Sequence, residues 1–195
     1  MAKNTAKKNT EENVKNNVAE AAEYDTALDT SKEEYAPINL EQQVTVKSIA
    51  PWTVGFTRIT GVGDVSIPKF GSTRLSRLEI ISQVQNNNTL LKGLPNQDRG
   101  DHATLLIQDE ATIRELGFQN AVVFSDKLVR DLFAISDFEK FEEELKDKIQ
   151  TRAEAFSIMV SIVRQKLNDY SKIRAVEQHT GISIEQIIKD EKNIR

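Results

Sequence analysis

APWTVGFTRITGVGDVSIPKFG, residues 50–71, is the stretch that decides the expected architecture of this chain. It contains four of the chain's eight glycines, two of its four prolines and its single tryptophan. β-Branched residues concentrate in 54–59 and 65–67, and Gly61-Val62-Gly63-Asp64 between them has the composition of a turn. The stretch therefore predicts two short strands joined by a turn, with a proline before the first strand and another after the second.

Further strands are expected on both sides of this pair. Residues 44–49 alternate between β-branched and polar side chains, and residues 90–91 and 103–107 are short apolar runs that suit strands. Five short strands are enough for a small sheet that is covered on one face. We therefore expect a β-rich module over residues 41–120.

One helix is expected inside this module. Ser76 and Glu79 match a capping box, in which the serine oxygen accepts a hydrogen bond from a free backbone N–H and the glutamate reaches back to the cap. This predicts a helix over residues 77–86, and a run of three asparagines suits its C-terminal end. With a helical region expected over 121–195, the fold class is α+β.

The helical region contains an apolar stripe at helical spacing. Ser136 and Glu139 match a second capping box, and they predict a long amphipathic helix over about 137–168. A helix of this length either spans an edge of the module or packs against another subunit. We therefore expect a partner interface formed by the stripe residues: Phe138, Phe141, Leu145, Ile149, Phe156, Val163 and Leu167.

The first 40 residues differ in composition from the rest of the chain. Residues 1–40 are rich in Asn, Lys, Glu, Ala and Thr, and hold five lysines against eight acidic residues. Such a segment buries too little apolar surface to offset the entropy lost on ordering. We expect a disordered polar arm that orders only against a partner.

Composition excludes several classes of function. The chain has no cysteine and only two histidines, which removes disulfides, thiolate zinc sites and His-rich metal centres. No nucleophile elbow, phosphate loop or helical His-Glu-x-x-His is present. No window resembles a signal peptide or a membrane span. We therefore expect a soluble protein with no enzymatic activity, no catalytic residue, no metal and no cofactor.

A cluster of basic residues suggests one alternative function. Residues 58–99 hold six basic residues against three acidic ones, and three aromatic residues, Trp52, Phe56 and Phe70, lie in or near this segment. The aromatics either stack on the bases of a single strand or form the core of the module. The residues that we consider for nucleic-acid contact are Arg58, Lys69, Arg74 and Arg77.

Two polar segments support weaker hypotheses. Residues 172–189 match a helix-turn-helix in part, with Gly181 in the turn but Glu177 where a small residue is expected. The surrounding region is slightly acidic, so we favour an ordinary helical hairpin here. Residues 98–102 contain Arg99-Gly100-Asp101, which we interpret as a solvated turn. Asp98, Asp101 and His102 in this loop lack the spacing of any calcium loop.

Three blocks of sequence carry a resemblance to a protein family: VTVKSIAPWTVGFTRITGVGDVSIP, LSRLEIISQVQNNNTLLKG and DHATLLIQDEATIRELGF. Together they span residues 44–118 and resemble small uncharacterised proteins of tailed bacteriophages that infect Gram-positive hosts. The resemblance implies a virion or assembly component made in the host cytoplasm, and it carries no functional motif. We expect a structural protein that forms homo-oligomers or binds other virion proteins, with a nucleic-acid-binding accessory protein as the alternative.

Overall fold

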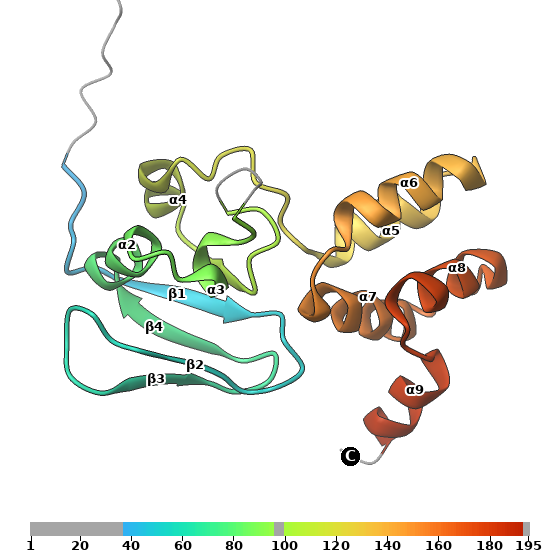
Figure 1. Ribbon diagram of the computed structural model, residues 1–195, viewed down its shortest axis with the longest axis horizontal. Helices are drawn as coiled ribbons and strands as arrows, with labels where there is room; N and C mark the ends of the chain where they lie inside the picture. The colour runs from blue at the N-terminus through green and yellow to red at the C-terminus, as the bar shows by residue number, and fades with distance from the viewer. Residues whose placement is uncertain (1–36, 96–99, 193–195) are drawn as a thin grey trace, which may run out of the picture. The chain divides into compact units, whose positions relative to one another are not determined.

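The computed structural model describes residues 37–95 and 100–192, and it shows an α+β protein, as expected (Figure 1). Most of the arm expected over residues 1–40 lies outside the described residues. Among those described, no helix is long and apolar enough to cross a membrane. The elements are, in chain order, β1 (Gln43–Ser48), β2 (Val54–Thr57), β3 (Asp64–Ile67), β4 (Ser72–Ser76), α2 (Arg77–Gln85), α3 (Thr89–Lys92), β5 (Leu105–Ile107), α4 (Glu110–Leu116), α5 (Asp126–Ala134), α6 (Phe138–Lys148), α7 (Arg152–Gln165), α8 (Tyr170–Thr180) and α9 (Ile184–Lys192).

Two small antiparallel sheets form the β-rich part. In the first, β1 lies between β4 and β5, with Val44 opposite Leu75 and Val46 opposite Ile107. Every second residue of β1 is buried, as the period of two in a strand requires. In the second, β2 and β3 form the hairpin predicted from residues 50–71, with Val54 opposite Ile67.

The structure corrects one predicted strand. Residues 90–91 lie in the short helix α3, because the Asn88 side chain accepts a hydrogen bond from Leu90 N and caps a helical turn that ends at Gly93. The strand that completes the first sheet is instead β4, whose polar sequence STRLS has only one buried residue, Leu75.

Glu79 connects α2 to the hairpin. Helix α2 begins where predicted, and Ser76 accepts a hydrogen bond from Glu79 N, but the Glu79 carboxylate is used elsewhere. It accepts from Ile59 N at 3.0 Å, from Thr60 N at 2.8 Å and from Gln83 Nε2 at 2.8 Å. Burial by itself raises the pKa of Glu79, but the hydrogen bonds outweigh it and lower the pKa to about 2.

The long helix expected over 137–168 is two helices. α6 ends at Lys148 and α7 begins at Arg152, so the prediction of one continuous helix is wrong. Thr151 and Glu154 form a full capping box that starts the second helix. The first helix also starts one residue later than predicted, since Asp137 is its cap in place of Ser136.

The described residues from Ile38 onward form one compact unit with two apolar cores. One core lies under the sheets and the other lies among α5 to α9. Buried polar contacts join the two. His102 Nδ1 lies 2.8 Å from Glu154 Oε1, with both side chains at most 3% exposed, and Ser157 Oγ donates to Ile49 O at 2.5 Å. The β-rich and helical regions are therefore parts of one unit.

Candidate functional site

The predicted apolar stripe is divided between core and surface. Three of its residues are at most 2% exposed: Phe141, Leu145 and Ile149. Three more are half-buried against the same core: Phe156, Val163 and Leu167. Only Phe138 is exposed, at 44%. This burial corrects the expectation that the stripe is a partner interface, because the break before α7 folds most of it into the chain's own core.

Arg77 is unavailable for nucleic-acid contact. It is 6% exposed, and its Nε and Nη2 donate to the two carboxylate oxygens of Asp109 at 3.1 and 3.2 Å. Its Nη1 donates to Asn39 O at 3.3 Å. The bonds from Arg77 are the main reason that the pKa of Asp109 is lowered to about 2. The prediction that Arg77 contacts phosphate is therefore wrong.

The other predicted basic residues do not form one patch. Arg58 follows β2 near the hairpin turn, whereas Lys69 follows β3 at the opposite end of the hairpin. Arg74 lies on the first sheet, opposite Thr45, and points to the exposed face. The structure thus separates three cations that the sequence places in one segment.

An exposed aromatic and arginine cluster joins the hairpin to the helical region. The rings of Trp52 and Phe156 meet edge to face with centroids 6.0 Å apart, and the Arg152 guanidinium lies 5.7 Å from each ring centroid. Arg152 and Phe156 share a face of α7 because they are four residues apart. Trp52 is 39% exposed, and among the described residues Arg152 makes no ion pair. We call these three residues the aromatic–arginine cluster.

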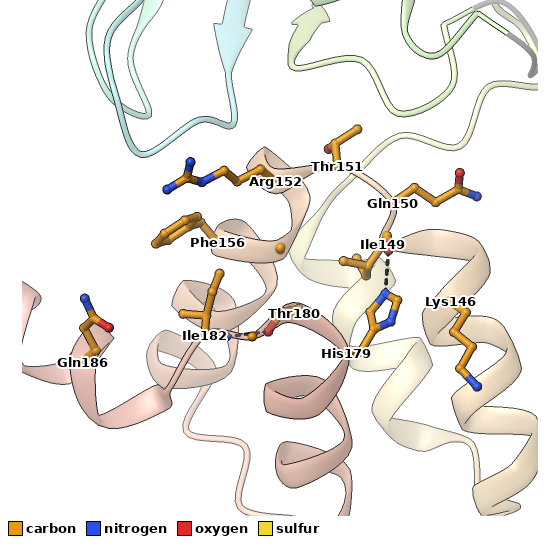
Figure 2. A pocket seen from close by; sticks show the side chains of 12 residues that line it. Lys146, Ile149, Gln150, Thr151, Arg152, Phe156, His179, Thr180, Ile182 and Gln186 are labelled. Atoms are coloured by element: carbon orange, nitrogen blue, oxygen red, sulfur yellow. Dashed lines mark hydrogen bonds between the residues drawn. The ribbon is translucent and has the colours of Figure 1, made fainter.

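A groove of about 790 Å³ extends from this cluster. The end of α6, the start of α7 and the turn between α8 and α9 surround it, and Figure 2 shows Arg152 and Phe156 on one side of it, with Lys146 and His179 on the other. His179 Nε2 lies 2.7 Å from Ile149 O. The described residues that line the groove include no carboxylate: Lys146, Ile149, Gln150, Thr151, Arg152, Ala155, Phe156, His179, Thr180, Gly181, Ile182 and Gln186.

The groove therefore combines apolar side chains with two cations, Lys146 and Arg152. The nearest acid on α7, Glu154, is buried and bonds to His102 and to the backbone N–H groups of Gln150 and Thr151. Glu154 is 2% exposed and is not among the residues that line the groove. Such a surface attracts a group that combines an apolar side chain with negative charge.

The aromatics of the hairpin are only partly in the core. Phe56 is half-buried against the first core, but Phe70 is 40% exposed, like Trp52. Phe70 N donates to Ala50 O at 2.8 Å, which places Lys69 and Phe70 beside the segment that carries Trp52. Of these three aromatic residues, only Phe56 packs against the core of the β-rich module.

The C-terminal helical pair packs as part of the second core. Gly181 adopts a left-handed conformation between α8 and α9, and Ile187 is 4% exposed. The exposed residues of α9 have mixed charge, with Glu185 beside Gln186 and Lys189. The α9 side chains that the structure describes, up to Lys189, form no basic face, and the helical hairpin stays the favoured interpretation.

The loop around Arg99-Gly100-Asp101 is described only in part. Asp98 and Arg99 lie outside the described residues, Asp101 accepts a hydrogen bond from Val122 N, and His102 faces Glu154. Within the described ranges, no group of three Asp, Glu, His or Cys residues is placed to hold a metal ion.

No local sequence pattern indicates the aromatic–arginine cluster, because Trp52 and Phe156 lie far apart in the chain. The nearest signal was the single tryptophan beside a proline in the glycine-rich stretch. Comparison with family models, curated proteins and solved structures gives no match. The site must therefore be interpreted from its own geometry.

Proposed function

We propose that this chain is a non-enzymatic structural or assembly protein that acts through protein–protein contacts and forms homo-oligomers. The observation that supports this best is the exposed aromatic–arginine cluster beside the groove. Tryptophan and arginine are the residues most enriched among those that dominate binding energy at protein interfaces. The cluster has that composition: the Trp52 and Phe156 rings in contact, and beside both an arginine that makes no ion pair with the residues described.

The proposed setting is a bacteriophage particle assembled in the host cytoplasm. This setting is supported by the resemblance of residues 44–118 to small phage proteins, and the fold is compatible with such a setting. Other virion or assembly proteins are then further partners.

The test is light scattering on a sizing column over a range of concentrations. The mass of the wild type should rise above 22.0 kDa with concentration. Trp52→Ala should weaken this self-association at least about tenfold. Val62→Ala, at a fully exposed valine in the hairpin turn, is the control and should behave as wild type. A wild type that stays monomeric at every soluble concentration would refute the proposal.

Single-stranded nucleic acid is the second candidate. The observation that favours it is the pair of exposed aromatics, Trp52 and Phe70, beside Lys69 and Arg152. Bases stack on such rings while cations attract the backbone. An oligonucleotide should quench the fluorescence of Trp52, the only tryptophan, and added salt should reverse the quenching. Unchanged fluorescence at low salt would remove this candidate.

A further inference from the structure

A second exposed surface, opposite in character to the groove, lies at the start of α6 and α8. Phe138 is 44% exposed and Tyr170 is 72% exposed, and each is the first residue of its helix. The flanking residues Asp137 and Glu139 are exposed acids. We call these four residues the acidic aromatic end.

The helices α6 and α8 run parallel, so this end and the groove lie at opposite ends of the same pair. Lys172, in the first turn of α8, places its ammonium 5.6 Å from the ring of Phe141, in the first turn of α6. At the other end, His179 contacts Ile149. Eleven residues of α6 at 1.5 Å each separate the two ends by about 16 Å. A chain therefore has no means of filling its own groove with its own acidic aromatic end.

The two surfaces are complementary in charge and in polarity. The groove offers Lys146 and Arg152 among apolar side chains, and the other end offers two exposed rings with a carboxylate on each side of Phe138. Lys140 and Arg174 also lie on these helices, and Arg174 stacks on the ring of Tyr170 at 5.8 Å. The Asp137 carboxylate caps α6 and Glu139 follows Phe138, and both acids are exposed where a cationic partner could reach them.

We infer that the acidic aromatic end of one copy docks in the groove and against the aromatic–arginine cluster of the next copy. This inference rests on the proposed self-association and specifies its geometry. Two different patches of the same chain form the contact, so it is head-to-tail. Such an interface produces a closed ring or an open filament in place of a two-fold dimer.

The test uses two variants that each remove one surface. Phe138→Ala with Tyr170→Ala removes the rings, and Lys146→Gln with Arg152→Glu removes the cations. Positions 138, 152 and 170 are first helical residues at the surface, where alanine or glutamate is well tolerated. Circular dichroism establishes that each variant is folded, and the single variants Tyr170→Ala and Arg152→Glu replace any double variant that is not.

Each variant alone should be at least about tenfold weaker in self-association than the wild type. An equimolar mixture should give a complex of two chains, because the intact end of one variant fits the intact groove of the other and growth then stops. Folded variants that assemble as wild type, or a mixture that stays monomeric, would overturn the head-to-tail inference while leaving self-association intact. A monomeric wild type would instead refute the proposed function itself.

Discussion

Replacing Glu79 by glutamine should destabilise the protein, because this buried carboxylate accepts hydrogen bonds at both oxygens. Ile59 N and Gln83 Nε2 donate to one oxygen, and Thr60 N donates to the other. Glutamine keeps one acceptor and presents an NH2 group to the donors on the other side. The side chain is fully buried, so the mismatch has no water to relieve it.

The lowered pKa of Glu79 gives the magnitude. A fall from the ordinary 4.5 to about 2 corresponds to about 3 kcal/mol of folding free energy. The folded state binds its proton less readily than the unfolded state, so this contribution is complete above pH 4.5. It declines as the pH falls from 4.5 toward about 2. Glu79→Gln should therefore lower the unfolding free energy by about 3 kcal/mol at neutral pH and flatten its decline in acid.

Urea unfolding followed by circular dichroism, at neutral pH and at several pH values below 4.5, measures both effects. Glu143→Gln, at an exposed position on α6, is the matched control and should change the unfolding free energy by less than about 0.5 kcal/mol. If Glu79→Gln is as stable as this control at neutral pH, the hydrogen bonds of the carboxylate contribute nothing net and the reasoning fails.

Three further substitutions test the packing. Gly93→Ala places a Cβ 1.8 Å from a backbone oxygen at a φ of +83°, so thermal unfolding should show a loss of more than about 3 kcal/mol in unfolding free energy. Gly63→Ala, with open space around it, is the control and should lose about 1 kcal/mol. Equal losses for the two variants would contradict the contact at Gly93. Arg77→Ala removes the cation from Asp109, which keeps only its bonds from Thr112, and should lower the urea midpoint by the equivalent of about 3 kcal/mol. An unchanged midpoint would mean that the pair is energetically neutral. Phe141→Ala should cost about 3 to 5 kcal/mol in the same assay, and a folded variant of wild-type stability would restore this residue to the predicted interface.

Local patterns predicted the hairpin and the start of α2. Glycines and prolines around 50–71 determine the turn, and Ser76 caps α2 with the bond expected of it. Such signals depend only on neighbouring residues, so tertiary packing elsewhere in the chain does not change the local structure that they predict.

The break between α6 and α7 was missed because an apolar stripe keeps its spacing through it. Ile149 is buried and Phe156 follows seven residues later, as in a continuous helix. Only Thr151 and Glu154, the capping box that starts α7, indicated the break. Periodicity identifies which residues face a core, but it does not distinguish a core within the chain from one shared with a partner.

The candidate site was missed for a different reason. The aromatic–arginine cluster combines a residue before β2 with two from α7, and only tertiary packing brings them together. Arg77 shows the converse, since its charge was visible in the sequence but its partner Asp109, 32 residues away, was not.

The buried pair of His102 and Glu154 couples the unfolding of the β-rich region to that of the helical region. The imidazole belongs to the β-rich region, whereas the carboxylate also caps α7, and Ser157 adds a second bond between the regions. A polypeptide severed after residue 120 would leave His102 without its partner in one fragment, and Glu154 Oε1 and Ser157 Oγ without theirs in the other. The fragments should therefore fold poorly when separate and recover when mixed, and the intact chain should melt in a single cooperative transition.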